Sequence, residues 1–468
     1  MAHEDPDWQA LAAEVEGEVL PPDAPGYETA RRPALARFRD ARPAAVVRCA
    51  SPADVAATIA FARAGGLPVA ARSGGHCLAG RSSTEGVVAD VGPMAEVAVA
   101  GGVATVGAGA RLGEVYDALA AEGLTIPAGC GPRVGAAGLV LGGGLGILGR
   151  MRGVLADSLV GADVVLADGR VVAADADHEP DLFWALRGAG AGGFGIVTAL
   201  RFAPLAAPDV TRFVHRWPAT AAAAVLDAWQ GWSPVAPDPL AASLLVAAPA
   251  DPAAALVVTV VGAYAGPREE AAALLADLAA RVGTPPGEAL LEHASYRETK
   301  RALSNDGAED PLEREHIAHR SMFFAAPIPP DATAALLAHV EAGRRPGEGR
   351  ELDFGPLGAA YARVPADATA FVHRDAAFLL KTSAVVAAGA DAGTKAAAQD
   401  WADRALEIVA PYGTGGVYQN FPEPGRPDWA RAYHGANLDR LAAIRERYDP
   451  DDVLHGPQTI PLPARSAA

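Results

Sequence analysis

The chain contains very few cysteines. Only Cys49, Cys77 and Cys130 occur among its 468 residues. Three cysteines are too few for a disulfide framework, and their spacing does not match that of a zinc site. The sequence therefore predicts a protein of a reducing compartment, the cytoplasm, with no metal site.

Long apolar runs and an excess of positive charge are also missing. No uninterrupted apolar run reaches the roughly 18 residues of a membrane-spanning helix, and the acidic residues 1–17 lack the apolar core of a secretory signal. The chain has 39 basic and 56 acidic residues, which gives a net charge of −17. This charge disfavours nucleic acids and anionic membranes as partners. The sequence leaves the oligomeric state open.

The chain is long and half of its residues are hydrophobic. A chain of this length exceeds what one hydrophobic core holds, so more than one domain is expected. Glycine-rich loops are frequent up to Leu205, disappear after it, and return near Gly415. We therefore predict a first domain over 1–205, an inserted domain over 206–414, and a segment over 415–468 that returns to the first domain.

Local patterns predict an α+β fold. The best-marked helix covers 51–66, with Ser51 as N-cap and glycines as the stop. A hairpin is expected to turn on Asp168–Gly169. In the inserted domain, long half-apolar segments such as 351–358 and 367–387 predict an antiparallel sheet with helices on one face.

A loop motif at 71–80 combines glycine and histidine. It reads "ARSGGHCLAG" and follows a predicted strand. Glycines let the backbone approach a ligand closely. Two matches to G-x-G-x-x-G, at 144–149 and 190–195, lack the strand and helix of a dinucleotide-binding βαβ unit. Several glycine loops that expose backbone N–H groups nevertheless suit a pyrophosphate.

Five segments occur in a recognisable order. They read "PVAARSGGHCLAG", "VGAAGLVLGGGLGILGRMRGVLADSLVGADVV", "DLFWALRGAGAGGFGIVT", "GGVYQNF" and "YDPDDVLHGPQTIP". Together they resemble the berberine-bridge-enzyme-like flavin oxidases, which belong to the vanillyl-alcohol-oxidase, or PCMH-type, FAD-binding superfamily. The resemblance covers about 43–461. It implies a two-part PCMH-type FAD-binding domain and an inserted substrate domain built on an antiparallel sheet backed by helices.

The resemblance also implies the residues that hold FAD. The family's Arg–Gly–Gly–His loop matches Arg72, Ser73, Gly74, Gly75 and His76. In the family, the loop amides bind the pyrophosphate and the histidine bonds covalently to the 8α-methyl of the flavin. The other implied cofactor-binding residues are Val134, Gly135, Gly142, Gly143, Gly144, Gly146, Asp157, Ile196, Val197 and Asn420.

One departure from the family concerns a second covalent link. Many members form it through a cysteine in a Cys-Pro-x-Val-Gly stretch, whereas this chain reads "GCGPRVG". Counted back from Val134, the cysteine position holds Gly131, and Cys130 lies one residue too early. In an extended loop a one-residue shift turns a side chain to the other side. We therefore predict a single link at His76, with Cys130 as a buried thiol.

Three residues are candidates for the chemistry. Tyr418 matches the active-site tyrosine of the family and is expected to take a proton from the substrate. We expect it on an extended strand, with Asn420 on the same side. Asp353 and His373 lie on segments that resemble the family's substrate-facing strands, with Arg374 and Lys381 close in sequence. A structural role remains the alternative for each of them.

The resemblance implies an FAD-dependent oxidase. It would remove a hydride from an alcohol, sugar hemiacetal or amine carbon of a small organic substrate and reduce O2 to H2O2. Val134 is a small residue of the type that family oxidases place near the oxygen site. The alternatives are a dehydrogenase with another electron acceptor, a flavin-carrying protein without turnover, and an NAD-linked protein.

Overall fold

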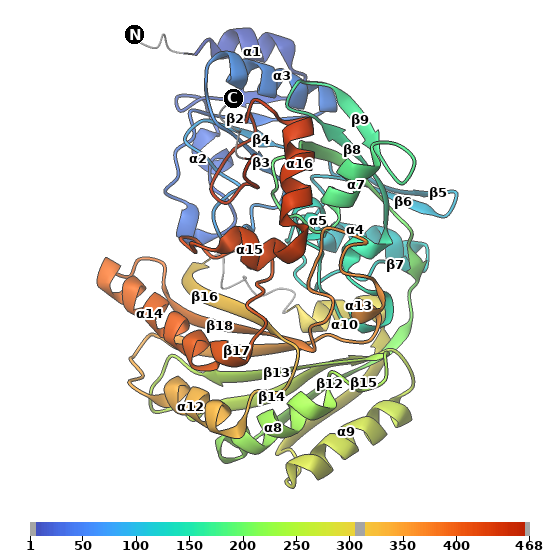
Figure 1. Ribbon diagram of the computed structural model, residues 1–468, viewed down its shortest axis with the longest axis vertical. Helices are drawn as coiled ribbons and strands as arrows, with labels where there is room; N and C mark the ends of the chain where they lie inside the picture. The colour runs from blue at the N-terminus through green and yellow to red at the C-terminus, as the bar shows by residue number, and fades with distance from the viewer. Residues whose placement is uncertain (1–5, 305–313, 464–468) are drawn as a thin grey trace.

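The computed structural model describes residues 6–304 and 314–463, which form two stacked units (Figure 1). The first unit contains a four-stranded sheet in the order β1-β2-β4-β3 and a five-stranded sheet in the order β5-β6-β10-β8-β9. The four strands are β1 (Glu18–Leu20), β2 (Ala45–Arg48), β3 (Val69–Arg72) and β4 (Val87–Asp90). The five strands are β5 (Val97–Ala100), β6 (Val103–Gly107), β8 (Leu159–Val165), β9 (Val171–Ala174) and β10 (Ile196–Phe202).

Short helices and one small strand pair complete the first unit. The helices are α1 (Trp8–Glu14), α2 (Tyr27–Ala30), α3 (Pro52–Ala64), α4 (Leu112–Ala121), α5 (Ala136–Leu141), α6 (Gly149–Arg152) and α7 (Pro180–Leu186), and the pair is β7 (Leu124–Thr125) with β11 (Leu205–Ala206). The C-terminal helices α15 (Trp429–His434) and α16 (Leu438–Tyr448) lie in this unit as well (Figure 1). The described C-terminal segment therefore returns to the unit that contains the N-terminal strands.

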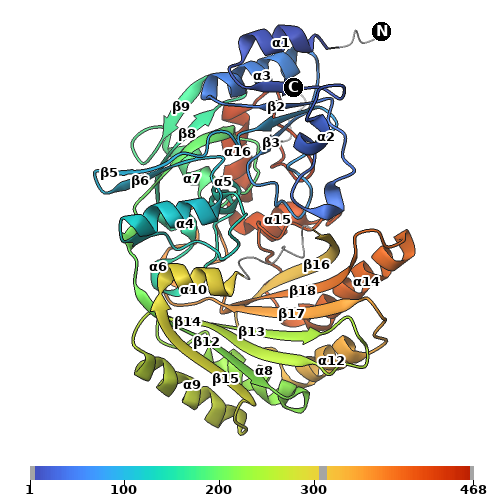
Figure 2. The same cartoon turned by 180° about the vertical axis from the view of Figure 1, so that it is seen from behind.

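The second unit is a seven-stranded antiparallel sheet in the order β15-β12-β14-β13-β17-β18-β16. Its strands are β12 (Asp209–Trp217), β13 (Leu240–Ala248), β14 (Val257–Tyr264), β15 (Glu288–Ser295), β16 (Glu315–Phe324), β17 (Gly349–Pro356) and β18 (Phe378–Ala387). Its helices are α8 (Ala222–Trp232), α9 (Arg268–Val282), α10 (Tyr296–Leu303), α12 (Pro330–Glu341), α13 (Ala360–Arg363) and α14 (Ala392–Val409). Both views show α8, α9 and α12 on the face turned away from the first unit (Figure 2). This mixture of helices and antiparallel sheets confirms the predicted α+β class.

One helix and one hairpin occur at the residues for which they were predicted. The Ser51 side chain accepts a hydrogen bond from Asp54 N and caps α3, which ends at Gly65. Strands β8 and β9 form the predicted hairpin, and Gly169 in its turn has a φ of +87°. The expected strand over 367–387 is correct only in its second half, because β18 starts at Phe378.

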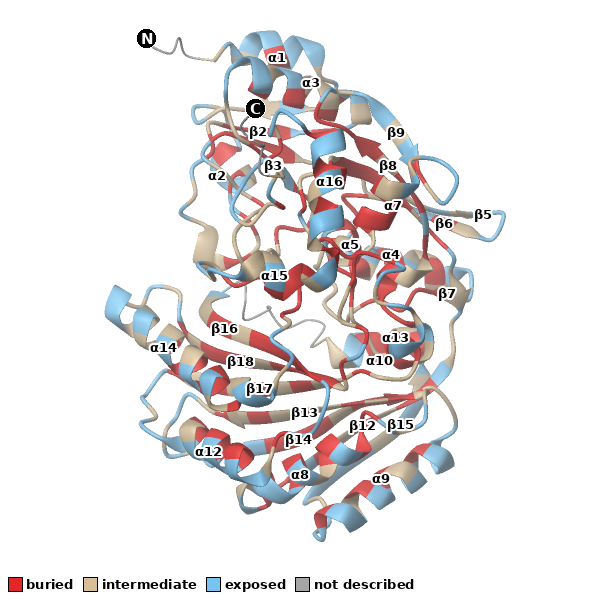
Figure 3. Ribbon diagram, viewed as in Figure 1, coloured by how far each residue is buried: buried red, intermediate tan, exposed pale blue. Residues whose placement is uncertain are grey.

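Strand β13 illustrates how the second sheet separates its two faces. Its alternate residues Leu240, Ala242, Leu244 and Val246 are buried in the core beneath the helices. The residues between them point to the opposite face, which looks toward the first unit. Buried residues are concentrated in the strands of both units, whereas the outer helices α9 and α14 carry many exposed ones (Figure 3). In the described parts of the chain, every helix is too short or too polar to cross a bilayer.

Candidate cofactor and substrate site

A cavity of about 800 Å³ lies between the two units. Loops of the first unit line one side, and strands of the second unit line the other. We call the second side the roof; it consists of Ala241, Ser243, Leu245, Asp353, Gly355, Leu379 and Lys381. The volume is typical of pockets that hold a cofactor or substrate.

Two glycine loops meet in this cavity with their backbones in contact. A Cβ atom at Gly74 would lie 2.4 Å from Gly135 N, and one at Gly135 would lie 2.2 Å from Ser73 Oγ. Gly75 has a φ of +71°, which side chains rarely adopt. Only glycine fits at Gly74 and Gly135, because any side chain there would collide with the facing loop. Predicted residues Arg72, Ser73, Gly74, Gly75, His76, Val134, Gly135, Gly146, Ile196, Val197 and Asn420 all line the cavity.

Polar atoms next to these loops have no partner within the described protein. The side-chain atoms Arg81 Nε, Ser82 Oγ and Ser83 Oγ are buried and make no hydrogen bond, although all three residues line the cavity. The N–H groups of Gly74 and Gly75 also donate to no acceptor among the described residues. Buried donors of this kind normally have partners. They therefore suit an anionic group such as a pyrophosphate.

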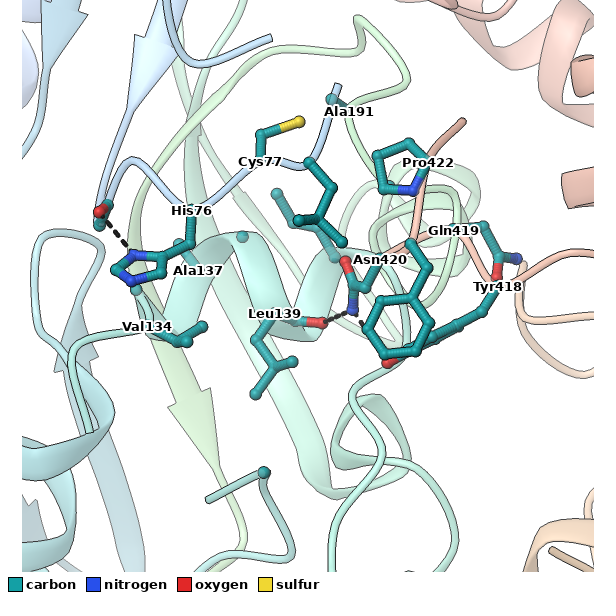
Figure 4. A pocket seen from close by; sticks show the side chains of 18 of the residues that line it. His76, Cys77, Val134, Ala137, Leu139, Ala191, Tyr418, Gln419, Asn420 and Pro422 are labelled. Carbon is teal, nitrogen blue, oxygen red and sulfur yellow. Dashed lines mark hydrogen bonds between the residues drawn. The ribbon is translucent and has the colours of Figure 1, made fainter. Parts of the chain in front are cut away.

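Arg72 stabilises this loop instead of reaching into the cavity with its charge. Its guanidinium donates to the carbonyls of Ala30, Arg31 and Ser82, and the residue is buried. His76 follows two residues after Gly74, whose carbonyl lies 2.9 Å from His76 Nδ1 (Figure 4). A carbonyl only accepts, so this contact places the proton on Nδ1 and leaves Nε2 as the basic nitrogen.

Tyr418 has an unusual set of partners for a tyrosine. Its oxygen accepts hydrogen bonds from Gly144 N and Leu145 N, both at 3.1 Å, and from Asn420 Nδ2 at 3.0 Å. Among the described residues, no acceptor is placed for the phenol's own proton. Burial raises the pKa of Tyr418 to about 12, and the three donors act in the opposite direction. Three donors stabilise a phenolate more than a phenol, but burial outweighs them and keeps the pKa of Tyr418 above its ordinary value.

The roof brings together opposite charges. Asp353 on β17 pairs in register with Lys381 on β18, and Lys381 Nζ lies 3.2 Å from Asp353 Oδ2. The ammonium also lies 5.3 Å from the centre of the Phe421 ring, which packs edge-on against Tyr418. Tyr418, Asp353 and Lys381 therefore belong to one continuous part of the cavity wall. Lys381 was noted in the sequence only as a neighbour of the candidate residues.

Four predicted cofactor residues lie elsewhere. Gly142 packs against the C-terminal segment and Gly143 against the second unit, where a Cβ atom would meet Asn420 and Phe371 respectively, whereas Gly144 packs against Leu155 of the first unit. Asp157 makes two 2.8 Å contacts with the Arg374 guanidinium. None of the four lines the cavity. In the structure the glycines let neighbouring segments approach closely, and Asp157 joins the two units through its ion pair with Arg374.

His373 is also absent from the cavity lining, and its predicted strand is wrong. It lies in an irregular segment before β18, stacks on Phe323 at 4.4 Å, and contacts the Tyr433 carbonyl through Nε2. Likewise, residues 418–421 form a turn closed by the Phe421 N to Tyr418 O hydrogen bond, not an extended strand. The turn still brings Asn420 to the Tyr418 hydroxyl, because the chain reverses between them.

Several buried histidines make stability depend on pH. Burial lowers the pKa of His373 to about 4, and the pKa of His319 and His434 to about 3. The unfolded chain takes up these protons near pH 6.5. The contribution of these histidines to the free energy of unfolding should therefore be largest above about pH 6.5. It should decrease as the pH falls from about 6.5 toward about 4, because the unfolded chain binds protons in this range while the folded histidines stay neutral.

Urea titrations at several pH values test this expectation. His434→Gln should reduce the slope of unfolding free energy against pH by about 1.4 kcal/mol per pH unit between pH 6 and 4. His178→Gln is the matched control, because His178 is exposed. Equal slopes for both variants and the parent would contradict the assignment.

The expectation for Cys130 is wrong in one respect. The residue is half-buried and lines the cavity together with Gly131. The segment 126–134 is irregular, so the two-residue alternation of an extended chain does not apply to it. Its sulfur lies 3.8 Å from Nζ of the buried Lys300, a residue that the sequence had not singled out.

Comparisons with known proteins agree with this geometry. A family model described as an FAD binding domain matches residues 43–175, and one described as berberine and berberine like matches 417–461. The FAD-linked oxidoreductase YgaK of Bacillus subtilis, named as uncharacterized, is 30% identical over 460 residues, which cover 96% of this chain and 98% of YgaK.

Two solved structures resemble the whole chain. A variant of BBE-like 1 from Physcomitrella patens has a TM-score of 0.88 at 27% identity, covering 98% of this chain and 99% of that one. Glucooligosaccharide oxidase from Acremonium strictum, whose FAD is named as 6-S-cysteinyl, 8α-N1-histidyl, has a TM-score of 0.86 at 25% identity, covering 97% and 98%.

The fold, the cavity and these matches define an FAD-linked oxidoreductase. The chain belongs to the berberine-bridge-enzyme-like family of FAD-linked oxidoreductases. The cavity fits FAD on its own chemistry as well, because the glycine loops and the unpartnered Ser82 and Ser83 hydroxyls offer donors to an anionic group.

Proposed function

We propose that the protein oxidises an alcohol, sugar hemiacetal or amine carbon of a small organic substrate and transfers the electrons to O2. When bound, FAD supplies the chemistry that accepts a hydride from carbon. The proposal rests on the Tyr418 oxygen, which accepts three hydrogen bonds at the cavity surface. These donors would stabilise the phenolate form, which can take a proton from the substrate.

The residues of the cavity then have distinct tasks. The loops at 72–76 and 134–135 would hold the FAD pyrophosphate, and His76 would attach the flavin. Tyr418 would accept the substrate proton, with the two amides and Asn420 stabilising the phenolate. Asp353 and Lys381 would bind polar groups of the substrate from the roof, and Leu245 and Leu379 would exclude water beside them.

The same proposal includes the division of the chain. The passage of the chain from β10 and β11 into the seven-stranded sheet, and its return to the first unit after α14, support boundaries near 205 and 415. Val134 lines the cavity, which supports O2 as the electron acceptor. Substrate screening with peroxide detection tests the proposal. Flavin bleaching by a substrate without peroxide formation in air would favour a dehydrogenase, and no bleaching by any substrate would favour a protein without turnover.

We further propose that the flavin has one covalent link only. The proposal rests on the sequence offset of Cys130, one residue before the family's cysteine position, and on the 3.8 Å contact that its sulfur makes with Nζ of the buried Lys300. Peptide mapping of the flavin-loaded protein should find the flavin mass on the His76 peptide and an alkylatable thiol at Cys130. Cys49 is the internal control, because it is a buried thiol that does not line the cavity. A flavin mass on the Cys130 peptide would show a second link.

A further inference from the structure

Lysine is nearly absent from this chain. Lys300, Lys381 and Lys395 are the only lysines among 39 basic residues, which leaves 36 arginines. Lys381 lines the cavity roof, and Lys300 lies directly behind the opposite wall. An ammonium is a compact charge, whereas a guanidinium is a broad planar fork. Two of the three lysines thus occupy places beside the cavity where a compact cation fits.

Lys300 extends from the second unit into the first. It belongs to α10, which docks on α4 through Arg297 and Arg301, both bonded to Asp117. Its Nζ donates to Ala128 O at 2.5 Å and to Gly129 O at 2.8 Å. Gly129 lines the cavity, so the ammonium lies one residue layer behind its surface.

Two aromatic rings and a thiol complete the surroundings of Lys300. Nζ lies 4.7 Å from the Tyr116 ring centre, 5.3 Å from the Tyr296 ring centre and 3.8 Å from Cys130 Sγ. The residue is 1% exposed. Ring faces and carbonyl dipoles favour a cation, and burial, which lowers the pKa of Lys300, opposes it.

The ammonium has no carboxylate partner in the described part of the chain. Its hydrogen bonds go to two carbonyls and a thiol, with no carboxylate among its ion pairs there. Arg150 crosses between the units in the opposite direction, from the first unit to the carbonyls of Pro234, Ala236 and Leu240 in the second. Unlike Lys300, it has a favourable charge interaction with a carboxylate, that of Asp238. A buried cation without a counterion is costly unless a negative group approaches it.

We propose that Lys300 is a positioning residue that holds a positive charge behind the cofactor wall and favours reduction of the bound cofactor. This inference rests on the proposed function. A cofactor that takes up electrons gains negative charge. A fixed cation behind a water-excluding wall stabilises that charge more strongly than a cation in water does.

The test compares midpoint potentials of flavin-loaded proteins, measured anaerobically against a reference dye. Lys300→Gln removes the charge but retains amide donors for the Ala128 and Gly129 carbonyls. Lys300→Met removes both. We expect the equilibrium constant for reduction to fall at least tenfold in both variants, which is about 30 mV for a two-electron couple. Lys395→Gln, on the outer helix α14, should keep the parental potential.

The alternative outcomes are distinct. A parental potential in Lys300→Gln would overturn the charge role, and a shift in Lys300→Met alone would then assign the effect to the hydrogen bonds. If Lys300→Met does not fold, Lys300→Gln decides alone. Absence of bound flavin in the parent protein would instead count against the proposed function, and that result is visible before any variant is made.

Discussion

The flavin should remain in the protein pellet when the parent protein is precipitated with trichloroacetic acid, and His76→Ala should release all of it into the supernatant. Acid unfolds the cavity and removes every non-covalent contact, so only a covalent bond retains colour in the pellet. The physical basis is the position of the imidazole in a loop whose glycines allow close backbone approach, with Nδ1 held by the Gly74 carbonyl.

A second histidine of the cavity gives the control for this experiment. His455 also lines the cavity, but it is exposed and lies in the C-terminal loop, where Nδ1 contacts the Asp452 carbonyl. His455→Ala should therefore keep the pellet yellow. Free flavin from the parent protein, or a yellow pellet from His76→Ala, would exclude His76 as the attachment site.

The sequence was most informative where backbone chemistry alone decides the structure. Helix α3 was predictable because Ser51 and Gly65 act locally as cap and stop. The meeting of the loops at Gly74 and Gly135 was predictable through the resemblance, since both positions must be glycine. In each case, a short stretch of chain contains most of the physical reason for its conformation.

The sequence was least informative about the direction in which a residue faces. The glycines at 142–144 allow close approach, but nothing in the stretch tells whether a ligand or another protein segment is the neighbour. His373 is similar: a polar residue in an apolar stretch suggests a site, yet here it is satisfied by the Tyr433 carbonyl and the Phe323 ring. These outcomes depend on partners far away in the chain.

Lys300 marks a different limit of sequence reasoning. Its environment is built from the loop at 128–130 and from Tyr116 and Tyr296, which are separated by up to about 180 residues. The scarcity of lysine in an arginine-rich chain was the available signal. It indicates that lysine is needed at a position, but it does not reveal what surrounds it.

Tyr418→Phe should slow reduction of the flavin by substrate at least about a hundredfold, because a positioned general base contributes about 10²–10⁴-fold. The substitution keeps the ring, with its edge-on contacts to Phe421 and Phe371, and removes only the oxygen. It also leaves the buried Gly144 N–H and the part-buried Leu145 N–H without their acceptor. We therefore expect a stability loss of about 1–3 kcal/mol, seen as a lower melting temperature, with the flavin still bound.

Tyr433→Phe separates the two effects of losing a buried hydroxyl. Tyr433 is as buried as Tyr418, its oxygen accepts from Glu423 N, and it does not line the cavity. The control should lose comparable stability but reduce its flavin within a few-fold of the parent rate. Stopped-flow absorbance near 450 nm measures reduction in both variants. If Tyr418→Phe also reduces within a few-fold of the parent, the base lies elsewhere, and Asp353 is the next residue to test because it faces the same cavity from the roof.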